Sequence, residues 1–358
     1  MDATGALTGR VLEERLVLRA PINGYTGYGL HACQIVSDFQ RMGYHIGVLA
    51  VELRESYAAI PSNVRESLIA EEHLCECELL LHAPGLPPLQ GRRTAYFTMW
   101  ESTRLPDYGV RALNQAECVF VPCAWNADCF RMSGVERPIR IVPLGIKKEV
   151  FPHSPMNMAG PCIFGTAGRL ESGGMRKGIA QVINLFQRAF ERREDVMLKV
   201  KVFPDCDLAE PADQRIQITR AFLSEQELAS WFNEITCFVS TSRAEGWGLM
   251  QQQAMAVGRP LMSVKYGGVG AFFVDGTGYP INFSLTEADG FYAGCGLWAN
   301  PHESHVIELM RRVYADRDEA RILGERASFA VSPFTWESSN RVLATHLQEF
   351  GMLRKNFS

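Results

Sequence analysis

The segment Cys237–Pro260, CFVSTSRAEGWGLMQQQAMAVGRP, combines three features that together indicate an α/β fold. Residues Cys237–Ser240 form an apolar run of strand length, and a helix is expected to start near Leu249. The turn between them contains Gly246 and Gly248, so unpaired backbone N–H groups and the positive end of the helix dipole would meet there. This arrangement suits a diphosphate, although glycines that merely permit tight packing would explain the same residues.

Two polar side chains accompany this turn. Glu245 precedes it and offers a carboxylate that can accept hydrogen bonds from sugar hydroxyls. Gln253 lies eight positions later, about two helical turns on and near the same helix face.

Outside this segment, short apolar strands alternate with amphipathic helices, which predicts a parallel α/β architecture. Strands are expected at Leu16–Leu18, Ile46–Val51, Leu79–His82, Thr94–Thr98, Cys118–Pro122, Ile139–Val142, Cys162–Thr166, Met197–Phe203 and Ile216–Ile218. Helices are expected from about Ala32 to Gly43, near 178–192, and over the tail Trp336–Phe350.

The segment Phe151–Pro161 holds three prolines and a glycine, which is typical of a link between domains. We therefore expect two Rossmann-like domains that face a cleft. The first domain would cover 1–155 and the second 156–335. Such sheets bind ligands beyond the carboxyl ends of their strands.

Composition narrows the class of protein. The chain has 358 residues, of which 47% are hydrophobic and 21% charged, as in globular proteins. No apolar run reaches the roughly 18 to 20 residues that span a bilayer, and two adjacent glutamates near the N-terminus replace the apolar core of an export signal. A cytoplasmic location is expected. The ten cysteines contain no CxxC pair, so buried free thiols are predicted.

Charge gives little support to an anionic partner. The net charge is -4, and the first 155 residues hold 15 Lys and Arg against 17 Asp and Glu. The first half of the chain thus has no basic surplus of the kind that binds nucleic acid or anionic lipid.

Two further motifs suit phosphate chemistry. Gly168-Arg169 is followed by Arg176-Lys177-Gly178, and an Arg and a Lys aimed at a departing diphosphate would stabilise its growing charge. Taken alone, these residues favour a solvated basic loop over a diphosphate site. The glycine-rich turn Gly24–Gly29 lacks a complete GxGxxG, which argues against a nicotinamide or flavin dehydrogenase.

The segment around Glu245 resembles the EGFG…EAMA signature of the retaining family-4 (group 1) glycosyltransferases, whose fold is GT-B. The motif from Gly168 to Gly178 is similar to the GR…KG pair of the same family. In that family the first glutamate contacts the transferred sugar and the second contacts the nucleotide ribose. Glu245 matches the first. Gln253 stands in place of the second, and a neutral amide is a weaker acceptor than a carboxylate.

The resemblance extends over about residues 20–350 and is strongest from 162 to 270. It implies that Arg169 and Lys177 neutralise the leaving diphosphate without a metal ion, and that Glu101 orients an acceptor hydroxyl or contacts the donor sugar. A purely structural role for Glu101 explains its position equally well. The implied donor-binding residues are Gly27, Gly29, Gly168, Phe222, Leu223, Gly246, Trp247, Gly248, Leu249 and Gln253.

Other family-like segments are Val142–Ile146, followed by Lys147 where the usual residue is an aspartate, and Gly267-Gly268. The final helix from Phe334 is similar to the one that crosses back onto the first domain. The resemblance implies an acceptor-binding domain over 1–155, with 336–358 packing back on it, and a nucleotide-sugar-binding domain over 156–335.

Two metal-like patterns are set aside. His302 and His305 lack a third ligand in view, and Asp205 and Asp207 lack the context of a metal-dependent transferase. No Gly-x-Ser-x-Gly elbow and no P-loop are present.

The resemblance implies a metal-independent, retaining glycosyltransferase that uses a UDP- or GDP-linked sugar and no cofactor. The acceptor remains open among a glycan, a lipid-linked sugar, a metabolite, a protein and a modified DNA base. A sugar phosphorylase of the same fold and a catalytically inactive nucleotide-sugar-binding scaffold are the alternatives.

Overall fold

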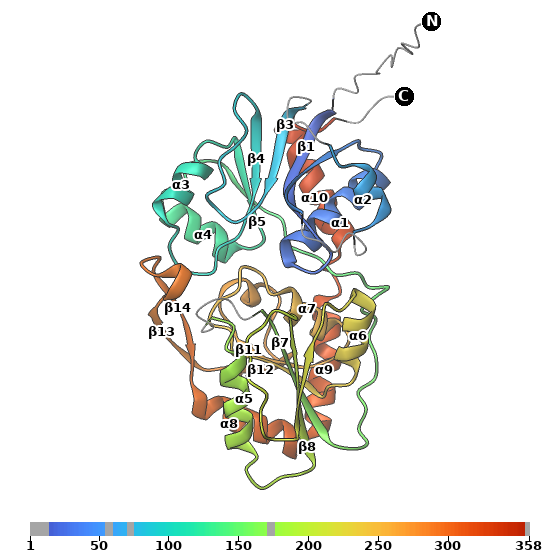
Figure 1. Ribbon diagram of the computed structural model, residues 1–358. Coiled ribbons are helices and arrows are strands. Elements are labelled where there is room, and N and C mark those ends of the chain that lie inside the picture. The colour runs from blue at the N-terminus through green and yellow to red at the C-terminus, as the bar shows by residue number, and fades with distance from the viewer. Residues whose placement is uncertain (1–13, 54–59, 70–74, 170–175, 355–358) are drawn as a thin grey trace, which may run out of the picture.

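The computed structural model describes residues 14–53, 60–69, 75–169 and 176–354, which form two α/β domains, one above the other in Figure 1. Each domain contains a six-stranded sheet, and every neighbouring pair of strands in these two sheets is parallel. The expected fold class is confirmed. The expectation of no export signal rests on N-terminal residues, most of which lie outside the described residues.

The first sheet has the strand order β2-β1-β3-β4-β5-β6. Its strands are β1 (Glu14–Ile22), β2 (Gly47–Leu53), β3 (Cys75–Leu81), β4 (Arg93–Phe97), β5 (Cys118–Val121) and β6 (Ile139–Ile141). Its helices are α1 (Gly27–Arg41), α2 (Ser62–Glu66), α3 (Asp107–Leu113) and α4 (Ala124–Met132). All four residues of β5 are buried, as expected for a central strand of a parallel sheet covered on both faces.

The second sheet has the order β12-β11-β10-β7-β8-β9. Its strands are β7 (Cys162–Ala167), β8 (Val196–Val202), β9 (Ile216–Arg220), β10 (Cys237–Ser240), β11 (Leu261–Val264) and β12 (Gly278–Ile281). Its helices are α5 (Ile179–Ala189), α6 (Glu225–Asn233), α7 (Leu249–Ala256), α8 (Glu303–Ala315) and α9 (Arg317–Val331). The strand order reverses between β7 and β10, so the loops after these two strands flank the crevice where such sheets bind ligands.

An antiparallel hairpin, β13 (Phe283–Glu287) and β14 (Leu297–Pro301), was not indicated by the sequence. Half of the residues in its strands are polar or exposed, so the alternation of polar and apolar residues is too weak to predict a strand. The hairpin leaves the second domain and reaches the side of the first domain where α3 and α4 lie (Figure 1).

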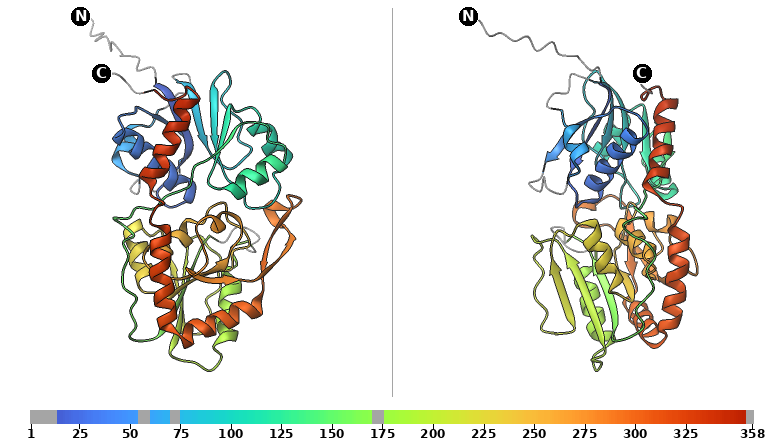
Figure 2. Two further views of the ribbon diagram at one scale, coloured as in Figure 1. Left: turned by 180° about the vertical axis from the view of Figure 1, so that it is seen from behind. Right: turned by 90° about the vertical axis from the view of Figure 1, so that its right-hand side faces the viewer.

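The last helix, α10 (Trp336–Glu349), returns to the first domain and packs against α1, as Figure 2 shows. Asn340 Nδ2 donates to Asp38 Oδ2 over 2.6 Å and to the Gln34 carbonyl over 3.3 Å. The outgoing and returning segments run side by side at Gly145, where a Cβ atom would lie 2.1 Å from the Trp336 nitrogen. The predicted crossing of the final helix is confirmed.

All ten cysteines are buried thiols, as the sequence indicated. Among the described residues, no helix has both the length and the apolar character needed to cross a membrane.

His31 on α1 is fully buried where α1, β4 and α10 meet. Its ring is stacked on Trp336 with centroids 5.1 Å apart and meets Phe97 edge-on at 4.6 Å. Neither ring nitrogen has a hydrogen-bond partner in the described part of the chain. Burial therefore disfavours the charged imidazolium and lowers the pKa of His31 to about 3.

We predict that His31→Leu reduces the loss of stability on acidification. The pKa of His31 is lower in the folded state than in the unfolded state, so the unfolded chain takes up the proton first as the pH falls. Between pH 7 and pH 5 this linkage removes about 2 kcal/mol from the wild-type free energy of unfolding. Urea denaturation at both pH values measures the difference. An identical pH dependence in the variant would contradict the prediction.

Candidate functional site

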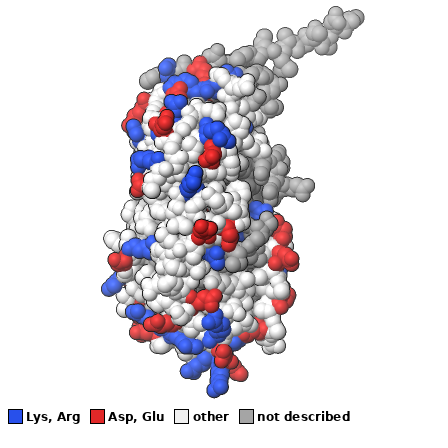
Figure 3. Space-filling view, turned by 90° about the vertical axis from the view of Figure 1, so that its left-hand side faces the viewer, with Lys and Arg blue, Asp and Glu red and all other residues white. Residues whose placement is uncertain are grey.

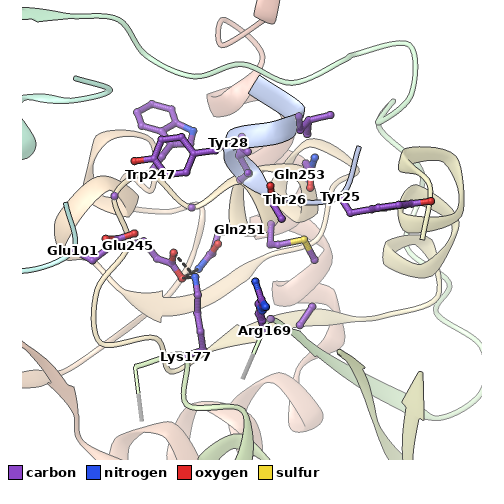
Figure 4. A pocket seen from close by; sticks show the side chains of 18 of the residues that line it. Tyr25, Thr26, Tyr28, Glu101, Arg169, Lys177, Glu245, Trp247, Gln251 and Gln253 are labelled. Atoms are coloured by element: carbon purple, nitrogen blue, oxygen red, sulfur yellow. Dashed lines mark hydrogen bonds and ion pairs between the residues drawn. The ribbon is translucent and has the colours of Figure 1, made fainter. Parts of the chain in front are cut away.

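A cleft of about 450 Å³ lies between the two domains. Its walls are the segments that follow β1 and β4 in the first domain and β7, β9 and β10 in the second. These are carboxyl ends of parallel strands, where α/β sheets place their ligands. Figure 4 shows side chains from both domains converging on this space.

Most residues singled out in the sequence line this cleft. They are Gly27, Glu101, Gly168, Arg169, Lys177, Leu223, Glu245, Gly246, Trp247, Gly248, Leu249 and Gln253.

Gly29 and Phe222 do not line the cleft. Gly29 packs instead against Asn23, whose carbonyl oxygen would lie 2.4 Å from a Cβ atom at that position. Phe222 stands beside the cleft, with its ring centroid 4.8 Å from Tyr25 and 5.3 Å from Phe203, and both of these residues line it.

Glu245 is the most heavily bonded carboxylate of the cleft. Lys177 Nζ donates to its two oxygens over 2.7 and 2.6 Å, and Gln251 Nε2 donates to Oε1 over 3.2 Å. Arg176 Nη1 lies 3.9 Å from Oε2. Burial by itself would raise the pKa of Glu245, but the charges of Lys177 and Arg176 outweigh it and hold this pKa below its ordinary value. Glu245 is therefore an anion at neutral pH.

Glu101 stands beside Glu245 (Figure 4) and comes from the loop after β4. Tyr292 donates its hydroxyl to Glu101 Oε2 over 2.6 Å, and Arg176 Nη1 lies 3.9 Å from Oε1. Burial raises the pKa of Glu101, and Arg176 only partly opposes the shift. The two carboxylates thus share one arginine and have pKa values shifted in opposite directions.

Sequence reasoning did not assign roles to Arg176, Gln251 or Tyr292. Arg176 was visible as the neighbour of Lys177 in the basic motif, and it also donates to the Ala244 carbonyl over 3.1 Å. Gln251 and Tyr292 gave no signal, because only the folded chain brings them to the two carboxylates.

The Glu245 loop rests on the Gly267-Gly268 turn, which belongs to the short 3-10 helix η3 (Gly267–Ala271). The Gly268 nitrogen donates to the Glu245 carbonyl over 2.8 Å. A Cβ atom on Gly268 would lie 2.2 Å from the Gly246 oxygen, so no larger residue fits there without a shift of the loop.

The N-terminal ends of α1 and α7 meet across the cleft. Gly27 and Leu249 are the first residues of these helices, and a Cβ atom on Gly27 would lie 3.7 Å from Leu249 Cδ1. Asn23 Oδ1 fixes the turn before α1 by accepting from the Tyr25 and Thr26 nitrogens over 3.1 and 2.8 Å. Two positive helix ends therefore point into the same space, which favours an anionic group between them.

Two further cations line this part of the cleft. Arg169 Nη2 lies 3.7 Å from Asp205 Oδ2, a contact between side chains that are both substantially exposed. Lys201 lies 4.4 Å above the Phe203 ring, and its burial lowers the pKa of its amino group to about 8. With Lys177, these groups supply positive charge around the two helix ends.

Asn126, on the first turn of α4, links the loops that carry Glu101 and Glu245. Its Oδ1 accepts from the Trp100 nitrogen over 2.8 Å, and its Nδ2 donates to the Gly246 carbonyl over 2.9 Å. The side chain is fully buried. One amide therefore sets the position of a first-domain loop against a second-domain loop.

Within the described residues, neither metal-like pattern, His302 with His305 or Asp205 with Asp207, belongs to a metal-binding group. No three or more His, Cys, Asp or Glu side chains of these described residues are placed to bind an ion. His302 occupies the N-cap position of α8 without a side-chain capping bond, and His305 Nδ1 accepts from the Asn282 nitrogen over 2.9 Å.

Comparison with known proteins relates part of this chain to one protein family. Residues 161–293 match the model of the family described as glycosyl transferases group 1. An uncharacterized glycosyltransferase of Methanocaldococcus jannaschii is 26% identical over 114 residues, which are 32% of this chain and 28% of that protein. The chain thus carries a group 1 glycosyl transferase domain in its C-terminal half. The predicted enzyme class is confirmed at the level of this domain.

Solved structures share the fold over most of the chain. Sucrose-phosphate synthase from Thermosynechococcus elongatus superposes with a TM-score of 0.69 at 14% identity, over 94% of this chain and 99% of that one. HepE from Anabaena, solved with UDP-glucose, gives 0.68 at 14% identity, over 93% and 99%. TarM from S. aureus, solved with UDP and a GlcNAc-glycerol, gives 0.57 at 15% identity, over 76% and 55%. The predicted GT-B fold is confirmed.

We predict that Asn126→Ala lowers the free energy of unfolding by about 3 kcal/mol, because it leaves a buried N–H and a buried carbonyl without their partner. Asn114→Ala is the matched control: this amide also accepts from a backbone nitrogen and donates to a carbonyl, at the surface. Water can replace those bonds, so a loss of about 1 kcal/mol or less is expected. Equal losses in urea denaturation would show that Asn126 is not a buried link.

Proposed function

We propose that the chain is a retaining glycosyltransferase that moves a sugar from a nucleoside-diphosphate sugar to an acceptor hydroxyl without a metal ion. The observation that carries this proposal is the Lys177–Glu245 pair, which lies in the same cleft as the first residues of α1 and α7 and is joined to α7 through Gln251. It places a cation suited to a diphosphate next to an anionic carboxylate suited to the hydroxyls of the transferred sugar.

In the proposed reaction, the bond between the anomeric carbon and the diphosphate oxygen breaks and a bond to the acceptor oxygen forms. The acceptor hydroxyl gives its proton to the leaving phosphate. Arg169, Lys177 and the two helix ends would stabilise the charge that develops on the diphosphate. Both Glu245 oxygens are engaged by Lys177, which makes this carboxylate a poor nucleophile and supports attack from the face of the leaving group.

The cleft also suggests how the donor lies. Figure 4 places Glu101, Glu245 and Lys177 at one end and Tyr25 with Gln253 toward the other. The sugar would occupy the first end, the diphosphate the middle, and the nucleoside the second end, near Leu223. The UDP bound by HepE and TarM supports a UDP-linked donor. The buried cysteine thiols suit a reducing compartment and support a cytoplasmic enzyme.

We predict that UDP or a UDP-sugar stabilises the wild-type protein in thermal-shift and calorimetric titrations, with GDP and ADP as comparisons, and that EDTA leaves the stabilisation unchanged. Lys177→Ala should weaken nucleotide binding by about tenfold to a hundredfold, the range expected for a lost hydrogen bond to a charged group. Lys265→Ala removes a cation that pairs with Asp275 outside the cleft and should have no effect. Binding that requires a divalent ion, or no binding of any nucleotide, would refute the proposal.

We predict that Glu245→Gln separates sugar transfer from nucleotide binding. The amide removes a negative charge beside Lys177, so UDP should bind as tightly as in the wild type or more tightly. Transfer, or hydrolysis of the donor sugar, should slow by about a hundredfold because the sugar loses a charged hydrogen-bond acceptor. Glu117→Gln alters a surface carboxylate that pairs with Arg93 and serves as the control. Unchanged turnover with Glu245→Gln would exclude the assigned role.

A further inference from the structure

The β13–β14 hairpin holds the tip of the second domain firmly against the first domain. The Thr103 nitrogen donates to the Leu297 carbonyl over 3.1 Å, and the Arg104 nitrogen donates to the Cys295 carbonyl over 3.0 Å. The Leu297 nitrogen donates to Thr103 Oγ1 over 2.8 Å. The short helix η4 (Gly290–Tyr292) at the hairpin tip is therefore fixed beside the loop that carries Glu101.

Three aromatic rings pack together at this junction, and one of them is open to solvent. Phe291 is 68% exposed, whereas Trp100 and Tyr292 are 1% and 7% exposed. The Phe291 centroid lies 5.9 Å from that of Trp100 and 5.2 Å from that of Tyr292. The exposed Phe291 ring therefore packs against one buried ring from each domain.

Single apolar side chains on a protein surface are ordinary, and Phe329 on α9 is one of them, with 82% exposure. Phe291 differs because it lines the cleft, whereas Phe329 does not. It also adjoins Tyr292, which holds the Glu101 carboxylate through its hydroxyl. An open aromatic face and a carboxylate therefore border the same end of the cleft.

Three arginines of the described residues near the hairpin each lie close to an acidic side chain. Arg104 lies 3.9 Å from Asp107, Arg243 lies 3.5 Å from Asp289, and Arg176 lies between Glu101 and Glu245. Figure 3, which views the side where the hairpin lies, shows acidic and basic side chains intermixed, without a broad basic patch. This end of the cleft offers an anionic acceptor little compensation for its charge.

We propose that Phe291 is a platform for the acceptor and that the acceptor is an uncharged saccharide. A pyranose ring has an apolar C–H face that suits the open phenyl ring, and its hydroxyl edge suits the Glu101 carboxylate. The inference rests on the proposed function, because it assigns the second substrate of the same cleft.

The test measures binding of maltose, cellobiose and lactose by ligand-observed NMR in the presence of saturating UDP. Glucose 6-phosphate and glycerol 3-phosphate serve as anionic comparisons. We expect at least one neutral disaccharide to bind the wild type. Phe291→Ala should weaken that binding by about tenfold, the factor that corresponds to 1.4 kcal/mol, and Phe291→Tyr should retain it. Phe329→Ala is the matched control and should bind like the wild type.

UDP affinity, measured by calorimetry, should be the same in all four proteins. The proposal is overturned if no neutral disaccharide binds the wild type, if Phe291→Ala binds it normally, or if only the phosphorylated compounds bind. Failure of the wild type to bind any nucleotide would instead refute the proposed function, so the two failures are distinguishable.

Discussion

A buried carboxylate needs positive charge close to it, and Glu245 imposes this constraint on the second domain. Its compensation comes from Lys177 and Arg176 in the segment between β7 and α5, and from Gln251 on α7. The segments after β7 and β10 are therefore fixed to each other at the point where the strand order reverses. A ligand that takes Lys177 as its own partner must also supply hydrogen-bond donors to the Glu245 carboxylate. A sugar diphosphate can do both, because its phosphates bind Lys177 and its sugar hydroxyls donate to Glu245.

The first domain completes this arrangement. Asn126 holds the Gly246 carbonyl, and Met99 packs so tightly on Gly246 that a Cβ atom there would lie 2.5 Å from Met99 Cγ. Arg176 contacts carboxylates from both domains. The geometry of the Glu245 loop thus depends on contacts that neither sheet provides alone, and the hairpin adds a third connection between the domains beside the two chain crossings.

Local patterns explain why much of this was readable from the sequence. The β10 strand, the Gly246–Gly248 turn and α7 are contiguous, so apolar runs and glycines were enough to predict them. The placement of Lys177 and Glu245 in one cleft followed from their motifs. Their direct bond joins residues 68 positions apart and is a property of the folded chain.

Tyr292 and Phe291 were missed because a weakly patterned hairpin carries them to Glu101. Gly29 was assigned to the donor because of its place in a glycine-rich turn, yet tight packing on Asn23 explains it.

The path of α10 has a consequence for the order in which the protein is made. The helix buries Leu343, Ala344 and Leu347 in the first domain, although it follows the whole second domain in the chain. During translation the first domain emerges from the ribosome before the second, but it lacks one of its covering helices until residues 336–349 have been synthesised. A nascent chain interrupted before residue 336 would leave that apolar surface of the first domain uncovered.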